Sequence, residues 1–152
     1  MKKIVLIYAS THHGNTRKLA EAISSRYKIT LIDAVRQETA DLSGYDLIGF
    51  ASGIDFGRFY EPVERFLERN LPDGKRVFFL YTCAKPDDRF TGRMREKALQ
   101  RNAILLGTYG CRRYNTYGPL KLIGGMNKGH PTAEELDGAI RFVKTLLEGQ
   151  RD

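Results

Sequence analysis

Short apolar runs alternate along the whole chain with stretches whose apolar residues recur every three or four positions. Uninterrupted apolar runs are typical of strands buried on both faces, and the longer spacing is typical of amphipathic helices. We predict strands at residues 3–8, 29–32, 47–51, 77–81 and 103–109, and helices at 15–27, from 61, at 91–101 and from 132 onward. Such alternation predicts an α/β fold, a doubly wound three-layer sandwich around a five-stranded parallel sheet with right-handed crossovers.

Two segments near the carboxyl end have contrasting patterns. Thr132 and Glu135 have the spacing of a helix-capping box, and apolar residues then recur on one helical face. Residues 112–131 have no such period and contain several glycines. A connection of this length is either a functional loop or an ordered surface loop that leads into the last helix.

The length of 152 residues predicts one domain, which spans residues 1–152. No apolar run approaches the roughly 20 residues that a membrane-spanning helix needs. The apolar run at residues 4–8 is also too short for a secretory signal, and no small-residue cleavage site follows it. We therefore expect a cytoplasmic protein with no membrane insertion.

The net charge of +7 is unevenly distributed. Residues 57–128 carry 15 Lys and Arg against 7 Asp and Glu, so the positive excess lies in this stretch. An acidic partner or simple solubility would explain it. The basic residues are scattered among acidic ones and form no dense run, which does not favour nucleic-acid binding.

The two cysteines, Cys83 and Cys111, are too few for a disulfide framework and do not have zinc-site spacing. Both follow apolar runs that we assign to adjacent strands, so their thiols are expected to lie near each other. Two partly buried free thiols are the favoured interpretation, with a redox pair as the alternative.

The segment between the first strand and the first helix is rich in hydroxyl, amide and imidazole side chains. A short turn of this kind before a helix presents free N–H groups and the positive end of the helix dipole to an anion. We therefore predict a phosphate site formed by Ser10, Thr11, His12, His13, Gly14, Asn15 and Thr16.

The turn lacks the residues that mark two common types of phosphate-binding site. A nucleoside-triphosphate loop ends in Gly-Lys-Ser/Thr, whereas this turn ends in Gly14-Asn15-Thr16. A dinucleotide fingerprint needs three glycines at fixed spacing, and only Gly14 is present. The two histidines have no evident third partner for a metal. A monophosphate is the favoured ligand.

Two further segments are expected at the same edge of the sheet, because they follow the third and fourth predicted strands. Residues 52–60 form a glycine-flanked, aromatic-rich loop, in which Ile54 and Phe56 are candidates for contact with a flat ring, while Phe59 and Tyr60 are expected to pack on the next helix. Residues 82–86 are small and allow close backbone approach. The predicted ring-binding residues are Ser52, Gly53, Ile54, Asp55, Phe56, Gly57, Thr82, Cys83, Ala84 and Lys85.

With these residues the sequence resembles the flavodoxin family. The resemblance rests on Ser10-Thr11-x-x-Gly14-Asn15-Thr16, on Asp46-Leu47-Ile48-Gly49 leading to Ser52-Gly53, and on five β/α units that cover the whole chain. It implies strand order 2-1-3-4-5 and FMN as cofactor, with the first turn on the phosphate and residues 52–57 and 82–86 beside the isoalloxazine ring. It also implies a backbone carbonyl that meets the N5 edge of the reduced ring, for which Gly53 and Gly57 are candidates.

The resemblance implies an electron carrier rather than a stand-alone enzyme, and such a carrier needs a redox partner protein. The positive excess in residues 57–128 predicts an acidic docking face on that partner. A flavin-dependent NAD(P)H oxidoreductase of the quinone-reductase type is the alternative, in which Lys85, Arg89, Arg112 and Arg113 would attract the acidic cofactor. A phosphate-accepting receiver domain is not favoured, since it needs acidic residues at the end of the first strand.

Overall fold

The computed structural model describes residues 2–9, 14–83, 85–112 and 132–149. A parallel sheet with strand order β2-β1-β3-β5-β6 forms its centre, and a two-residue strand, β4, pairs antiparallel with the end of β3. The strands are β1 (Ile4–Ala9), β2 (Ile29–Asp33), β3 (Leu47–Asp55), β4 (Arg58–Phe59), β5 (Arg76–Cys83) and β6 (Ile104–Arg112). The α/β doubly wound fold is confirmed, but the sheet has six strands rather than five, since β4 was not predicted. Without β4, the parallel strands follow the expected 2-1-3-4-5 order.

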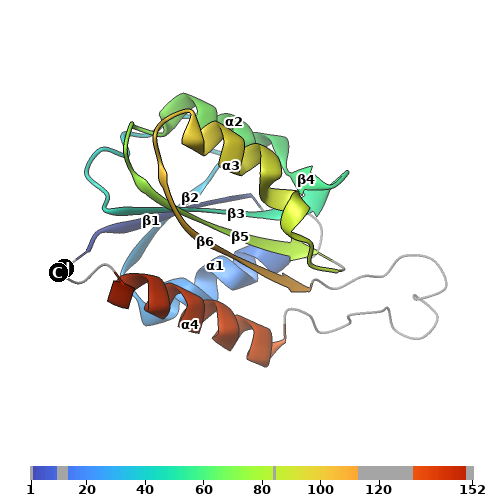
Figure 1. Cartoon of the computed structure of the whole chain (residues 1–152). Coiled ribbons are helices and arrows are strands. Elements are labelled where there is room, and N and C mark those ends of the chain that lie inside the picture. Colours follow the sequence, from blue (N-terminus) through green and yellow to red (C-terminus); the bar gives the residue numbers. More distant parts are fainter. Residues whose placement is uncertain (1, 10–13, 84, 113–131, 150–152) are drawn as a thin grey trace.

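Helices cover both faces of the sheet and complete three layers, with α2 and α3 on one face and α1 and α4 on the other (Figure 1). They are α1 (Asn15–Arg26), α2 (Glu61–Asn70), the 3₁₀ turn η1 (Asp88–Thr91), α3 (Gly92–Leu99) and α4 (Ala133–Gly149). No helix among the described residues has the length and apolar character needed to cross a membrane.

Each face of the sheet has its own apolar core, because successive side chains of a strand point to opposite faces. Phe78 belongs to the core beneath α1 and α4, whereas the next residue, Phe79, belongs to the core beneath α2 and α3. Both phenylalanines are 1% exposed. The continuous apolar character of β5 is therefore explained by burial on two sides.

The capping box predicted for the last helix is confirmed. The Glu135 backbone N–H donates to Thr132 Oγ1 at 3.1 Å, and the Glu135 carboxylate accepts from the Thr132 backbone N–H at 3.1 Å. Ala139 and Val143 then lie buried in the core between α4 and the sheet. This helix begins where local hydrogen bonding alone predicts it.

The loop predicted at residues 52–60 is wrong in its first part. β3 continues to Asp55, and residues 58–59 return as β4, so most of the segment is a hairpin. Ser52 and Gly53 resemble turn residues in sequence, but they pair with Ala9 of β1 and Thr82 of β5. The ladders on both sides therefore extend the strand beyond its apolar run.

Smaller corrections concern other element ends. Thr82 and Cys83 lie within β5 rather than in a loop, and β6 continues to Arg112. The helix predicted at 91–101 is α3, which is shorter, spans Gly92–Leu99 and is preceded by η1. Most of residues 112–131 lies outside the described part of the chain.

Candidate functional site

The carboxyl ends of β1, β3 and β5 meet at one edge of the sheet, where the strand order reverses. β1 leads through α1 to β2 on one side, and β3 leads through α2 to β5 on the other. In open α/β sheets this reversal opens a crevice beyond the strand ends, which is where ligands bind. Two polar residues, Ser52 and Thr82, are fully buried at this edge.

The amino terminus of α1 opens onto this edge. Gly14 precedes the helix in a left-handed conformation, with φ of 68°, which glycine adopts without steric cost. The first backbone bond of the helix runs from the Lys18 N–H to the Gly14 carbonyl. Helix geometry therefore leaves the N–H groups of residues 15–17 without helical acceptors, and no acidic side chain lies in this first turn. The positive end of the α1 dipole is not neutralised by its own first turn, in contrast to α4, which has its capping box and two glutamates.

Asn15 places a polar group with no partner in this turn. It is 5% exposed, and its Oδ1 atom is buried with no hydrogen-bond partner within the described structure. Such an orphaned acceptor costs about 1–3 kcal/mol. A ligand hydroxyl could donate to Oδ1, or a rotated amide could donate its NH₂ to a phosphate oxygen. The residue therefore fits a ligand that has both hydroxyl and phosphate groups.

Thr16 connects this turn to the end of β5. Its Oγ1 lies 3.1 Å from Thr82 Oγ1, and both residues are at most 2% exposed. The two hydroxyls come from positions 66 apart in the sequence. The predicted phosphate turn and the predicted third segment are therefore in direct contact.

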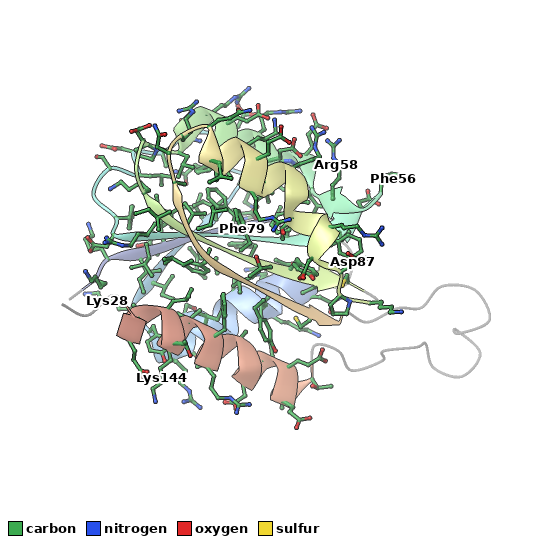
Figure 2. All side chains as sticks on the ribbon, in the orientation of Figure 1. Lys28, Phe56, Arg58, Phe79, Asp87 and Lys144 are labelled. Carbon is green, nitrogen blue, oxygen red and sulfur yellow. The ribbon has the colours of Figure 1, made fainter. Side chains whose placement is uncertain are left out.

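The β3–β4 hairpin reverses the chain through Phe56 and Gly57. Both residues have positive φ, 52° and 74°, as in a type I′ turn, and Asp55 pairs with Arg58 across it. Positive φ is unusual for a bulky side chain. Phe56 is also 96% exposed. Figure 2 shows it projecting from the same end of the molecule as Arg58 and Asp87. An exposed aromatic side chain held in an unfavourable conformation indicates a role outside the core.

Hydrogen bonds fix the base of this hairpin. The buried Ser52 hydroxyl accepts from the Tyr60 N–H at 2.9 Å and donates to the Gly53 carbonyl at 2.5 Å. A Cβ atom on Gly53 would collide with the Tyr60 ring. A side chain at position 53 would therefore require the Tyr60 ring to move, whereas Gly57 is the glycine of this hairpin with positive φ.

A buried carboxylate connects the hairpin to two helices. Glu64 of α2 is 4% exposed and contacts Arg93 and Lys97 of α3 as well as Arg58 of β4, with N···O distances of 2.7, 3.5 and 3.8 Å. Burial acts to raise the pKa of Glu64, but the Arg93 hydrogen bond and the three positive charges outweigh it and hold that pKa below its usual value. We did not predict this role, although a glutamate next to buried Val63 on an amphipathic helix is a signal of it.

The third predicted segment continues from β5 toward η1. Tyr81 is buried, and its hydroxyl accepts from the Asp87 N–H at 3.0 Å. The Asp87 side chain caps η1 by accepting from the Arg89 N–H, and hydrogen bonds from Arg89 lower the pKa of Asp87 to about 2. Lys85 between them is exposed. These contacts hold the chain beyond β5 close to the sheet edge.

The two cysteines are free and buried, as expected, but they face different cores. Cys83 lies with the core under α2 and α3, and Cys111 lies with the core under α1 and α4. Burial raises the pKa of the Cys111 thiol to about 12. The sheet therefore separates the two side chains, and this arrangement does not support a redox pair.

The predicted site residues fall into three groups. Ser10, Thr11, His12, His13 and Ala84 lie outside the described residues. Those brought to the carboxyl edge are Gly14, Asn15, Thr16, Ser52, Gly53, Thr82 and the hairpin residues Asp55, Phe56 and Gly57, with the exposed Lys85 just beyond the end of β5. Ile54 and Cys83 lie instead in the apolar core. Phe59, which was expected to pack on the next helix, is also in this core and packs edge-to-face against Phe79. The ligand contacts of the site residues stay predictions.

A hollow of about 710 Å³ lies at the opposite edge of the sheet, beside the start of β1 and the end of α1. Its lining includes the cations Lys2, Arg26 and Lys28. Helix C-termini carry partial negative charge, and Arg26 lies in the last turn of α1. Arg26 therefore has a favourable interaction with the end of its own helix.

Comparison with known proteins agrees with this arrangement. Residues 5–121 match the flavodoxin domain family. An uncharacterised protein of Methanocaldococcus jannaschii is 33% identical over 148 residues, covering 96% of this chain and 99% of the relative. The chain belongs to the flavodoxin family.

Solved structures show the same flavodoxin fold. Oxidised flavodoxin 1 from Bacillus cereus superposes with a TM-score of 0.72 at 18% identity, covering 98% of this chain and 99% of the other. A flavoprotein from Lactobacillus acidophilus in complex with FMN has a TM-score of 0.57 at 21% identity, covering 72% of this chain and 93% of the other. The family and the fold support a flavin-binding protein, and the turn before α1 lies at the carboxyl edge of the strands, where open α/β sheets bind ligands.

Proposed function

We propose that this member of the flavodoxin family binds FMN and transfers electrons to or from a partner protein. The observation that carries the proposal is the amino terminus of α1, where free N–H groups, the buried Thr16 and the unpartnered Asn15 Oδ1 meet at the strand crossover. Bound FMN supplies one- and two-electron redox chemistry. The protein supplies binding, orientation and the electrostatic environment.

The phosphate end of the cofactor is held by the first turn of α1. The N–H groups of residues 15–17 and the Thr16 hydroxyl provide donors without a positively charged side chain from the described turn. Ser10, Thr11, His12 and His13 are proposed to add donors from the preceding segment. The absence of a lysine at the Gly14-Asn15-Thr16 position favours a single phosphate over a triphosphate.

The ring end of the cofactor lies between the hairpin and the end of β5. Phe56 offers an exposed aromatic face, which suits contact with a flat heteroaromatic ring. Gly57 provides the backbone freedom for a carbonyl to turn toward the ring, whereas Gly53 is confined by Tyr60. Ser52 and Gly53 form the end of β3 beneath this position, whereas the Thr82 hydroxyl of β5 contacts Thr16 in the first turn of α1.

Binding is tested by titrating the ligand-free protein with FMN and following flavin fluorescence and absorbance. We expect one FMN per chain and weaker binding of riboflavin, which lacks the phosphate. Asn15→Ala should weaken FMN binding, and the matched control Asn70→Ala should not, because Asn70 lies at the end of α2 and bonds the Glu38 carbonyl. A protein that takes up neither flavin would contradict the proposal.

The redox partner is proposed to be a protein with an acidic docking face. Phe56 and Lys85 are both exposed at the ligand end, and Lys85 forms no ion pair within 4.0 Å among the described residues. Arg58, in contrast, is engaged by Glu64. Complementary charge increases the rate of encounter and makes it dependent on salt.

The alternative function is that of an NAD(P)H oxidoreductase on the same fold. Lys85 and Arg89 would then attract the acidic nicotinamide cofactor. Steady-state oxidation of NADPH and NADH by the FMN-loaded protein, with a quinone as acceptor, separates the two functions. Turnover without any partner protein supports the enzyme, whereas reduction only through a partner reductase supports the carrier.

A further inference from the structure

We propose that Thr82 is a positioning residue for phosphate recognition, which sets the direction of the Thr16 hydroxyl from beneath the α1 turn. This role rests on the proposed function, because Thr82 would act on the FMN phosphate only through Thr16. It starts from the 3.1 Å contact between the two hydroxyl oxygens. Both side chains are buried, at 2% and 1% exposure, so water does not replace either partner.

The contact can form in two directions, because each hydroxyl has one proton and two acceptor lone pairs. In the first direction Thr16 donates to Thr82, and the Thr16 proton is not available to a ligand. In the second direction Thr82 donates to Thr16, and the Thr16 proton is free to point elsewhere. Thr16 lies in the first turn of α1. In the second direction its hydroxyl therefore adds one donor to the backbone N–H groups of that turn.

A phosphate dianion accepts hydrogen bonds and does not donate them. It therefore selects the second direction, in which the proton of Thr82 goes to Thr16 and the proton of Thr16 goes to a phosphate oxygen. Hydrogen bonds in such a chain polarise one another, which strengthens the outer bond. No covalent bond changes in this arrangement.

The position of Thr82 is fixed by the sheet. β5 lies between β3 and β6, and Thr82 pairs with Gly53 on one side and Cys111 on the other. The alternation of side chains places it on the same face as Leu80, which packs in the core under α1. A valine would have the same shape and would suit this apolar position. Packing therefore explains the shape of the Thr82 side chain but not the presence of its hydroxyl.

The test compares FMN with riboflavin for Thr82→Val, which keeps the shape and removes the hydroxyl. We expect Thr82→Val to weaken FMN binding about two- to tenfold, as for loss of one neutral hydrogen bond that orients and polarises the Thr16 hydroxyl, and to leave riboflavin binding unchanged. Thr82→Ser should restore FMN binding. Thr91→Val is the matched control, because Thr91 is equally buried but bonds the Asp88 carbonyl on the other face of the sheet.

The outcomes separate this proposal from the proposed function. Equal effects of Thr82→Val on both flavins would indicate a structural role and overturn the positioning role, as would no effect on either. If the wild-type protein binds no flavin, the proposed function fails, and this inference fails with it. Thr82→Ala provides the same comparison if the valine variant does not fold, which circular dichroism would detect.

Discussion

The Glu64 carboxylate of α2 accepts three hydrogen bonds from Arg93 of α3, at 2.7, 3.1 and 3.3 Å, while remaining almost completely buried. Arg58 brings the β4 end of the hairpin to the same carboxylate. One side chain thus joins two helices to the segment that carries Phe56. The position of Phe56, the proposed ring contact, therefore depends on the Glu64 carboxylate, a charge that does not itself reach the ligand.

Glu64→Gln should destabilise the fold by about 2 kcal/mol, since it removes the acceptor charge of a buried, hydrogen-bonded ion pair. Urea unfolding of the wild type and the variant measures the difference. Glu61→Gln is the matched control: Glu61 pairs with Arg65 on the exposed face of the same helix, and its loss should cost less than about 0.5 kcal/mol. Equal decreases in the free energy of unfolding for the two variants would show that the buried ion pairs of Glu64 stabilise the fold no more than the exposed pair of Glu61.

Acid should destabilise the wild type more than Glu64→Gln. The pKa of Glu64 is lowered in the folded protein, and its ordinary value is 4.5. A depressed carboxyl pKa stabilises the fold above the unfolded value and loses that contribution as the pH falls through the folded value. We therefore expect wild-type stability to decline below about pH 4.5, with a shallower decline in the variant, in urea titrations at a series of pH values. Parallel pH profiles for the two proteins would contradict this assignment.

Phe56→Asn should stabilise the fold while weakening FMN binding. The substitution places asparagine before Gly57, the combination preferred where both turn residues have positive φ. The expected gain is about 0.5–1 kcal/mol in urea unfolding. The ring contact is lost at the same time, so the FMN dissociation constant should rise. Leu99→Asn is the control: it removes another exposed apolar side chain, at the end of α3, and should leave FMN binding unchanged. A variant that is more stable and binds FMN as before would remove Phe56 from the site.

The two thiols should react only when the protein unfolds. Both are buried, and the raised pKa of Cys111, about 12, keeps that thiol protonated at neutral pH. Thiol titration with a chromogenic disulfide should give no reaction in buffer and two equivalents in denaturant. Mild oxidation should produce no intramolecular disulfide, since the sheet separates the side chains. Because the folded pKa of Cys111 is raised from 9.0, its contribution to stability should decline between about pH 9 and 12.

Structural features that depend on neighbouring residues were predicted from the sequence more completely than features that depend on contacts between distant segments. The capping box of Thr132 and Glu135 and the turn at Gly14 depend on neighbouring residues, and both were located from sequence. The β3–β4 hairpin was not, because Phe56-Gly57 lacks the asparagine or aspartate that marks such turns.

The parts of the site that were missed depend on packing between distant segments. Thr82 was assigned to a loop, whereas pairing with β3 and β6 extends the strand and points its hydroxyl at Thr16. The role of Glu64 requires Arg93, which is 29 residues away. The sequence marks Glu64 only by its place beside an apolar position of the helix, and residue spacing identifies neither Arg93 nor the Thr16–Thr82 contact.

The unpartnered Asn15 oxygen also has a consequence for the life of the protein before it acquires a ligand. A buried acceptor without a donor lowers the stability of the empty chain, and any molecule that supplies the donor binds the folded state alone. Melting temperature should therefore rise with ligand concentration. Chains without the proposed ligand should therefore be less stable and more susceptible to proteolysis than loaded chains, so ligand supply should influence the abundance of this protein.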